Sequence, residues 1–354
     1  MSVRMFLSWS WLLVLLLSAH IAWGGAIRET SVGPPPIRPT PPPIHRILSP
    51  GHAVYLPLLQ AATAPAPWVD TWDREASRRL YQVAYRGSAG ADIGWTGNHA
   101  ACDPGETGPE FRAAMARRIN YFRSMAGVPP IRLNPGYNTK AQHAALLMSA
   151  NRALSHTPST DWSCYRASGE EGAGSSNLFL GVYGPQAISG YIYDPGEGNY
   201  PVGHRRWILY PQTRQMGTGD IPPRDGYPAA NALWVFDRDA MWGPRPQTRD
   251  DFVAWPPPGY VPYPVVYPRW SLSYPNADFT QATVTMAQDG QALAVQVHPP
   301  VDGYGENTLV WEPQARFDTA SNGEIRYQVR IDNVWVDGRS RTFTYTVIVF
   351  DPGP

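Results

Sequence analysis

The sequence lacks an excess of charge of either sign and has almost no lysine. Its 29 basic residues balance 29 acidic residues, so the formal net charge is zero. A neutral chain has no global field that attracts nucleic acid or an anionic membrane, and nucleic acid is not an expected partner. Lys140 is the only lysine, and the other basic residues are arginines. Genome composition is the simplest cause of this bias, and the preference of arginine for fixed, bidentate pairing is a weaker one.

Several catalytic motifs are also absent. The chain has no His-Glu-x-x-His, which would place two metal ligands on adjacent helical turns, and no phosphate-binding or dinucleotide-binding glycine motif. Residues 172–176 are rich in glycine and serine but do not form Gly-x-Ser-x-Gly, so a loop is their simplest interpretation. These absences argue against a nucleophilic hydrolase and against a nucleotide-dependent enzyme.

Cysteine is scarce, because Cys102 and Cys164 are the only two. In an exported chain an even count predicts a disulfide, and two cysteines allow only one pairing. The bridge would close a loop of about sixty residues and contribute ~4 kcal/mol in the chain-entropy account. The alternative is two reduced, buried thiols.

Residues 1–24 have the pattern of an export signal: Arg4 precedes the apolar run at residues 11–17, and small residues follow. The alternative is an uncleaved membrane anchor, because no charged residue occurs between Met5 and Ile27. Polar residues interrupt the apolar run and favour cleavage. We therefore expect the mature chain to be secreted, or tethered to the outside of the cell membrane. A membrane is an expected partner only if the segment stays uncleaved.

The 38 prolines and 32 glycines predict many loops and at least one extended linker. Proline triplets favour a stiff polyproline II linker before the folded part, and a second proline cluster precedes a change of pattern. The predicted division is an export signal at 1–24, a proline-rich linker at 25–67, a helical extension at 68–97, a first domain at 98–245, a second linker at 246–266 and a final domain at 267–354.

Helical periodicity marks the first domain. Helices are expected over residues 109–126, 138–154 and 185–193, and a buried strand over 229–237. An earlier helical pattern at 69–85 predicts a face formed by Trp72, Ala76, Leu80 and Val83 or Ala84. The fold class of this part is therefore α+β.

The final domain has a different pattern. Short strand-like runs occur at 270–274, 282–286, 293–297, 308–311, 325–331 and 343–350, separated by turn signals. The last two alternate apolar and polar residues as half-buried strands do. So many short strands in one segment predict an immunoglobulin-like β-sandwich.

Two histidines stand out by position. His156 and His204 each lie at an element boundary beside glycine, proline or serine, and Asp194 ends the helix ten residues before His204. Two imidazoles and a carboxylate resemble an open metal site. From spacing alone, however, buried and hydrogen-bonded histidines are the better interpretation.

Several segments carry a family resemblance. The helix at 118–123, the segment 154–156 that ends in His156, the helix at 187–194 and the Gly-His-Arg-Arg-Trp run at 203–207 resemble, in this order, elements of the CAP superfamily of bacterial type (cysteine-rich secretory, antigen 5 and pathogenesis-related proteins, the SCP domain). The resemblance covers roughly residues 98–240. It implies a three-layer α-β-α sandwich, here followed by the β-sandwich.

The resemblance also implies a cleft with two histidines and two acids, which in some members binds zinc or another divalent ion. His156 and His204 match the histidines, and Asp194 takes one acidic place. The second acidic place falls on Ser176, followed by Asn177, which departs from the family pattern. Glu170 or Glu171 is an alternative source of that carboxylate.

Three hypotheses follow. The first is a non-enzymatic binding protein whose His/Asp cleft takes a divalent metal such as Zn²⁺, or a small hydrophobic ligand or peptide. The second is a metal-dependent hydrolase, protease-like, that uses His156, His204 and Asp194 around an activated water. The third is a structural component of the cell envelope. The missing acid and the absent nucleophile favour the first.

Overall fold

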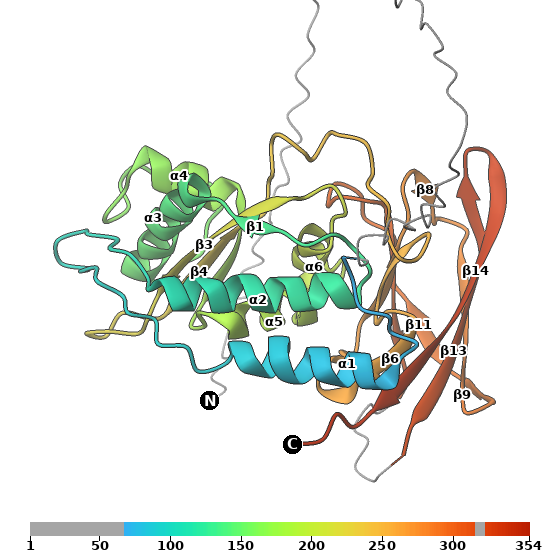
Figure 1. Cartoon of the computed structure of the whole chain (residues 1–354). Helices are drawn as coiled ribbons and strands as arrows, with labels where there is room; N and C mark the ends of the chain where they lie inside the picture. The colour runs from blue at the N-terminus through green and yellow to red at the C-terminus, as the bar shows by residue number, and fades with distance from the viewer. Residues whose placement is uncertain (1–66, 316–322) are drawn as a thin grey trace, which may run out of the picture. The chain divides into compact units, whose positions relative to one another are not determined.

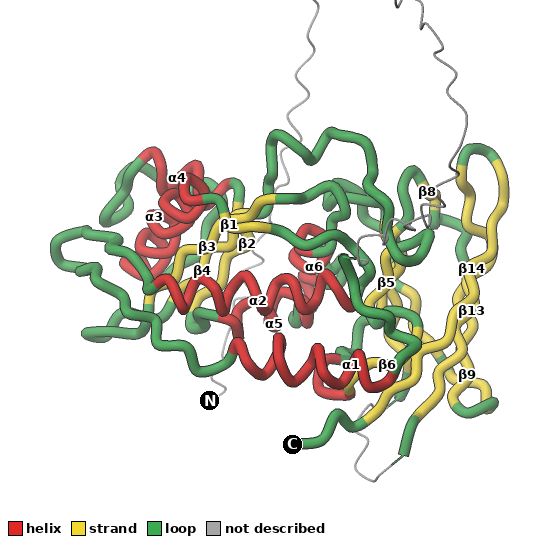
Figure 2. Tube along the Cα trace, viewed as in Figure 1, coloured by secondary structure: helices red, strands yellow, loops and turns green. Residues whose placement is uncertain are grey.

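A computed structural model describes residues 67–315 and 323–354, which all lie in one compact unit spanning 63–354. The predicted export signal at 1–24 and the predicted linker up to residue 66 lie outside the described residues. Within the described ranges, no helix is both long enough and apolar enough to cross a membrane. Figure 1 shows the elements, and Figure 2 shows that helices alternate with strands first and that strands dominate toward the C-terminus.

The helices begin and end where the local chemistry favours it. Pro109, Pro135 and Pro185 occupy the first turn of α2, α3 and α5, where a missing backbone N–H costs nothing. The α-helices are α1 (Arg74–Leu80), α2 (Pro109–Met125), α3 (Pro135–Asn151), α4 (Ala167–Gly174), α5 (Pro185–Tyr193) and α6 (Gly203–Ile208). Short helical turns are η1 (Tyr81–Tyr85), η2 (Arg86–Ser88), η3 (Glu197–Asn199) and η4 (Tyr263–Val265).

A four-stranded sheet of order β1-β3-β4-β2 forms the middle of the α/β region (residues 109–237). Its strands are β1 (Arg132–Leu133), β2 (Ser176–Leu180), β3 (Gln215–Ile221) and β4 (Ala230–Trp234). Along β4, Ala232 and Trp234 join the core beneath α3, whereas Leu233 and Val235 join the core on the opposite face. Because a strand directs successive side chains to opposite faces, both faces of this sheet are buried.

Helices cover the two faces. Figure 1 shows α3 and α4 on one side of the sheet and α2 and α5 on the other. Gly219 of β3 lets α3 approach closely, since an added Cβ would lie 2.1 Å from the carbonyl carbon of Ala141. The mixed α/β class is confirmed, and the helix–sheet–helix layers agree with the arrangement expected for the first domain.

The face predicted for the first helical segment is correct in part. Ala84 is buried and Leu80 packs against the core, but Ser77 and Tyr81 are buried too, and Trp72 and Val83 are 55% and 71% exposed. Trp72 precedes α1, and from Tyr81 onward the wider turn of η1 departs from an ideal helical repeat.

Two further sheets form the C-terminal sheet region (residues 253–354). One has the order β10-β9-β13-β14-β6, with β8 beside β13, and the other has the order β11-β12-β7-β5. Their strands are β5 (Val253–Trp255), β6 (Gly259–Pro262), β7 (Trp270–Ser273), β8 (Ala277–Asp278), β9 (Thr283–Gln288), β10 (Gln291–Leu293), β11 (Val295–Val297), β12 (Thr308–Pro313), β13 (Ile325–Val336) and β14 (Arg339–Phe350). Trp270 of one sheet meets Tyr327 of the other edge to face at 5.5 Å. The immunoglobulin-like class stays a prediction.

The predicted linker at 246–266 is corrected in part, because β5 and β6 lie within it. Trp255 is fully buried and packs edge to face on Phe122 of α2, with ring centroids 5.2 Å apart. β6 pairs in parallel with β14. The many prolines of this stretch favour a linker in the sequence, and the two strands are only three and four residues long.

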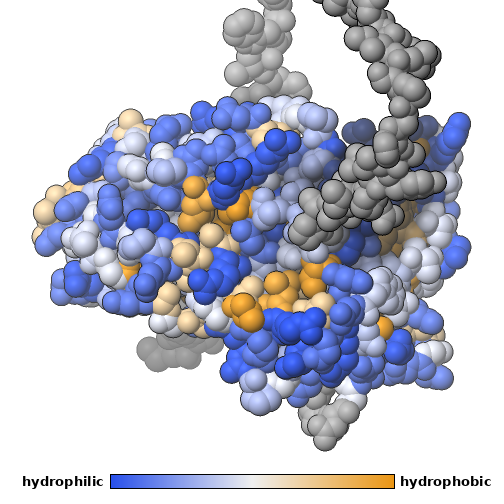
Figure 3. Space-filling view, viewed as in Figure 1, coloured by the Kyte–Doolittle hydropathy of each residue, from blue (hydrophilic) through white to orange (hydrophobic). Residues whose placement is uncertain are grey.

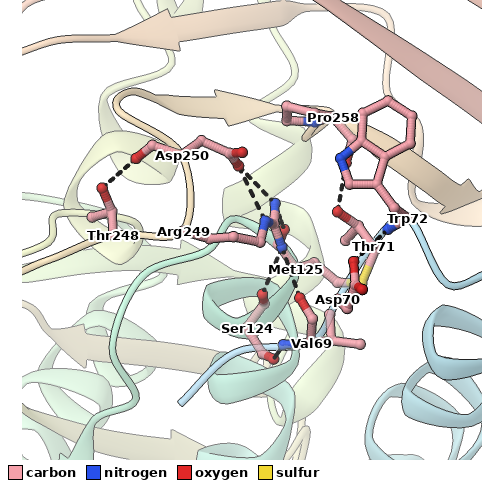
Figure 4. Close-up of polar contacts among 10 residues, drawn as sticks. All are labelled: Val69, Asp70, Thr71, Trp72, Ser124, Met125, Thr248, Arg249, Asp250 and Pro258. Atoms are coloured by element: carbon pink, nitrogen blue, oxygen red, sulfur yellow. Dashed lines mark hydrogen bonds and ion pairs between the residues drawn. The ribbon is translucent and has the colours of Figure 1, made fainter. Parts of the chain in front are cut away.

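Arg249, which precedes the C-terminal sheet region, joins the end of α2 to the segment before α1. Its guanidinium donates to the carbonyl oxygens of Val69 (3.1 Å) and Met125 (2.9 Å) and also pairs with Asp250. Figure 4 shows these contacts beside the hydrogen bond from the Thr71 hydroxyl to the Pro258 carbonyl (2.6 Å). The two regions share a continuous apolar core and polar contacts such as those from Arg205 to the Arg269 carbonyl oxygen and the Ser271 hydroxyl.

The predicted disulfide between Cys102 and Cys164 is present. It ties the loop before α2 to the loop between α3 and α4. A hydrogen bond from the Arg166 guanidinium to the Cys102 carbonyl oxygen (2.8 Å) supports the same junction.

Candidate functional site

His204 is held in one orientation by Asp194. Asp194 follows the last turn of α5 in the left-handed conformation and is 1% exposed. One of its carboxylate oxygens accepts from His204 Nδ1 (2.7 Å), and the other accepts from the His204 backbone N–H (3.0 Å). Since Nδ1 carries the proton donated to Asp194, Nε2 is the ring atom left for a ligand.

His156 is fixed in the same manner by the backbone. It lies in the loop after α3, and its Nδ1 is 2.9 Å from the carbonyl oxygen of Ala173 in α4. A carbonyl oxygen only accepts, so Nδ1 must donate and Nε2 is again the free ring atom. Different local structures thus present two imidazoles with the same tautomer.

The two histidines line the same pair of neighbouring cavities, which we call the His cleft. Its aromatic lobe has a volume of about 360 Å³ and includes Trp207, Phe236 and Tyr304. Its leucine-rich lobe has a volume of about 430 Å³ and is lined by Leu154, Leu178, Phe179, Leu180, Tyr191 and Pro195. His156, His204 and Asn199 line both lobes. Each volume falls in the range of small-molecule sites.

Ser176 and Asn177 face the aromatic lobe from the start of β2. The Asn177 side chain has a structural role, because its N–H donates a hydrogen bond to the His204 carbonyl oxygen (3.1 Å). Ser176 differs: it is 5% exposed, and its hydroxyl oxygen has no hydrogen-bond partner among the described residues. A buried hydroxyl without a partner is costly, and here it lies beside an open cavity.

Glu170 and Glu171 do not replace the missing acid. Glu170 accepts a short hydrogen bond from the Tyr165 hydroxyl, and Glu171 pairs with Lys140 (2.8 Å). Neither lines a lobe of the His cleft. Together with Ser176 in the family's acidic position, this leaves Asp194 as the cleft carboxylate.

The two Nε2 atoms are the ring nitrogens that the cleft could offer to a metal ion. They are fewer than the three protein ligands of catalytic zinc sites, and both oxygens of Asp194 accept hydrogen bonds from His204. Across residues 67–315 and 323–354, no group of three or more histidine, cysteine, aspartate or glutamate side chains is arranged to hold an ion. Asp194 has the geometry of a residue that orients His204.

A Ser-His-Asp triad is not assembled either. Asp194 and His204 have the contact expected of an acid and a base in such a triad, but the Ser176 hydroxyl contacts neither imidazole within hydrogen-bond distance. The arrangement supports recognition of a polar group more directly than attack on a carbonyl carbon.

Another cavity, of about 480 Å³, lies beside α3 and contains His143 and Arg112. His143 Nδ1 is 2.6 Å from the Ser168 hydroxyl, and the Arg112 guanidinium donates to the Thr107 carbonyl oxygen. These polar side chains are used within the fold, so we place the candidate site at the His cleft.

The sequence identified the two histidines and Asp194, which the structure brings together, but missed Asn199, Phe236 and Tyr304. Asn199 and Tyr304 lie in loops, which carry no periodic signal. Arg205 and Arg206 belong to the Gly-His-Arg-Arg-Trp run, but the local sequence does not indicate their long-range partners.

Comparisons with known proteins find a family match within the α/β region of this chain. Residues 116–236 match the model of the cysteine-rich secretory protein family, CAP. The human Golgi-associated plant pathogenesis-related protein 1 is 23% identical over 141 residues, which span 35% of this chain and 86% of that protein. A crystal structure of PcoC, a methionine-rich copper resistance protein from Escherichia coli, overlaps 27% of this chain and 93% of its own, with 18% identity and a TM-score of 0.22. A CAP family domain therefore lies at residues 116–236.

Proposed function

We propose that the CAP family domain of this chain works as an extracellular binding module, in which the His cleft holds a small amphipathic ligand. The observation that carries the proposal is the division of the cleft into a leucine-rich lobe and an aromatic lobe, both of which are lined by His156 and His204. Pockets of mostly apolar lining with a few convergent polar groups are typical ligand sites.

The polar groups define the chemistry of the ligand. Each Nε2 accepts a hydrogen bond when its ring is neutral and donates one when the ring is protonated. The Ser176 hydroxyl adds a donor and an acceptor that nothing in the described chain uses. A carboxylic acid group suits these partners in either protonation state, and an attached alkyl chain suits Leu154, Leu178 and Leu180.

The proposed location rests on separate support. A disulfide joins Cys102 and Cys164, and disulfides persist in oxidising compartments outside the cytoplasm. Together with the expected export signal, this favours a secreted or surface-tethered protein. The envelope-component hypothesis shares this location but makes no use of the cleft.

Titration with dodecanoic acid tests the proposal by calorimetry. We expect saturable binding to wild-type protein, and about tenfold weaker binding to His204→Gln, because the lost interaction is a hydrogen bond to a charged or polar head group. His143→Gln is the matched control, since His143 lies outside the His cleft. Absence of binding, or equal losses in the two variants, would contradict the proposal.

A divalent ion in the cleft is the competing proposal, because imidazole is a common ligand of Zn²⁺ and related ions. Zinc titration of wild-type protein in the absence of dodecanoic acid distinguishes the two. Zinc binding that requires both His156 and His204, with no binding of the acid, would favour the ion.

A further inference from the structure

One wall of the aromatic lobe comes from the C-terminal sheet region. The loop at residues 298–307 joins β11 to β12, and its Gly303 and Tyr304 line the same cavity as His156 and His204. Tyr304 lies outside residues 116–236, so the matched CAP family domain does not contain this wall. The His cleft is therefore built from two parts of the chain.

The loop is fastened to the helix that carries His204. Arg206 of α6 donates to the carbonyl oxygens of Val301 (2.7 Å) and Glu306 (3.0 Å). The Glu306 carboxylate in turn pairs with Arg245 at 2.6 Å. Since Arg206 is only 5% exposed, these are well-shielded contacts, and they fix both ends of the segment that presents Tyr304.

The Tyr304 ring is seated next to His204. Its face lies 5.3 Å from the Arg206 guanidinium carbon, in the range of a cation–π contact. A Cβ added at Gly203 would lie 2.8 Å from the ring carbon Cδ1 of Tyr304, so the ring lies directly against the backbone before His204. Tyr304 is 37% exposed, which leaves part of the ring to face a ligand.

We infer that Tyr304 is a specificity-determining residue that limits the size of the polar head group beside His156 and His204. This inference rests on the proposed function of the His cleft. The contacts of Arg206 with Val301 and Glu306 fix the backbone that presents the ring, and Gly203 and Arg206 lie directly against the ring itself. A ligand with a compact acid group fits the aromatic lobe, whereas the same chain with a bulky head meets the ring.

The test compares dodecanoic acid with monododecanoyl glycerol, which has the same chain and a larger head group. Calorimetric affinities are measured for wild-type protein, Tyr304→Ala and Tyr304→Phe. Wild type should prefer the acid. Tyr304→Ala should bind the glycerol ester about tenfold more tightly than wild type does, the scale on which pocket size discriminates, and bind the acid with little change.

Two control variants distinguish a direct effect of the Tyr304 ring on head-group size from a general effect on packing. Tyr304→Phe keeps the ring and should keep the wild-type preference. Trp335→Ala removes another partly exposed aromatic side chain of the C-terminal sheet region, 46% exposed on β13, and should leave both affinities unchanged. Near-ultraviolet circular dichroism verifies that each variant retains its tertiary packing.

The outcomes are distinguishable. Equal changes for both ligands in Tyr304→Ala, or no change for either, overturn the inference while the proposed function stands. Failure of wild-type protein to bind either ligand overturns the proposed function and this inference with it.

Discussion

Among single residues, Asp194 sets the tautomer and the orientation of His204. Its two oxygens accept from the ring and from the backbone N–H of that histidine while its own side chain is almost fully buried. An orienting acid of this kind acts on a ligand mainly through the imidazole that it holds. The residue that resembled a metal ligand in the sequence is thus better placed to select a tautomer.

We predict that Asp194→Ala loosens His204. The variant loses two hydrogen bonds to a buried acceptor, so the free energy of unfolding should fall by about 1–3 kcal/mol, and the affinity for dodecanoic acid should fall as the ring loses its fixed tautomer. Urea denaturation and ring-nitrogen NMR measure the two effects. Asp351→Ala, at an exposed residue, is the control. An unchanged His204 tautomer would contradict this role.

Ser176→Ala should have opposite effects on stability and binding. Removing a buried hydroxyl that lacks a partner should raise the free energy of unfolding by about 1 kcal/mol, and the same change should weaken the binding of dodecanoic acid, because Ser176 lines the aromatic lobe. Chemical denaturation and calorimetry of one protein preparation test both. A loss of stability would show that the hydroxyl has a structural partner instead.

The residues of the site were only partly predictable from the sequence. His156, His204 and Asp194 stand at element ends, and a boundary position is a local feature that a sequence displays. Tyr304 reaches the site only because Arg206 bonds a loop almost one hundred positions later in the chain. Nothing in the local pattern of residues 298–307 encodes that partner.

At the scale of elements, Arg269 of the loop before β7 and Glu312 of β12 join the site to the C-terminal sheets. Arg269 donates to the Asp194 carbonyl oxygen (2.7 Å) and to Glu312 (3.0 Å), and His298 also contacts Glu312 (3.0 Å). Burial raises the pKa of the Glu312 carboxyl, but the hydrogen bonds from Arg269 and His298 and their charges outweigh it, so the pKa lies below its ordinary value of 4.5.

A lowered carboxyl pKa predicts stability that is present above the unfolded pKa and lost as the pH falls through the folded one. Glu312→Gln should therefore cost up to about 1 kcal/mol near neutral pH, a modest value because the pair is partly exposed. The cost should vanish below the folded pKa, where wild type is also neutral at this position. Denaturation at a series of pH values checks it, and a cost independent of pH would contradict the sign.

The disulfide, which joins two loops, should contribute to the stability of the protein. Replacing both Cys102 and Cys164 by alanine releases the loop before α2 from the loop after α3, and should lower the free energy of unfolding by about 2–4 kcal/mol. Because His156 lies in the second of these loops, ligand affinity should fall as well. Thermal unfolding of the double variant measures the first effect, and an unchanged melting temperature would contradict it.

Elements with strong local signals were well predicted. The helix at 185–193 has a proline at its start and an Asp-Pro-Gly stop, and α5 has these bounds. The strands β5 and β6 were not foreseen, because Trp255 becomes a core residue only through Phe122 of a distant helix. The helical segment at 69–85 was located correctly, but its buried face follows the wider turn at Tyr81, which period counting does not anticipate.

At the scale of the whole molecule, the α/β region and the C-terminal sheet region share one apolar core. Arg205 strengthens the junction, since it is 1% exposed and donates to the Ile192 and Arg269 carbonyl oxygens (2.6 and 2.8 Å). Burial lowers the pKa of its guanidinium to about 10, so it remains charged near neutral pH. Figure 3 shows apolar patches enclosed by hydrophilic surface on one face of the molecule.

A shared core predicts a single cooperative unfolding transition for residues 63–354. Calorimetry should give a van't Hoff enthalpy equal to the calorimetric one, and Arg205→Ala should shift the whole transition because it leaves buried carbonyl oxygens without donors. The exposed Arg330→Ala serves as the control. Two separate transitions, with only one of them shifted, would show that the regions fold independently.

Ring-nitrogen NMR during titration with dodecanoic acid reports whether His156 and His204 together hold the polar end of a ligand. Nε2 of both rings should shift saturably while the resonances of His143 and His298 stay in place. Unchanged resonances of His156 and His204 at saturating ligand, or shifts confined to His143, would contradict it.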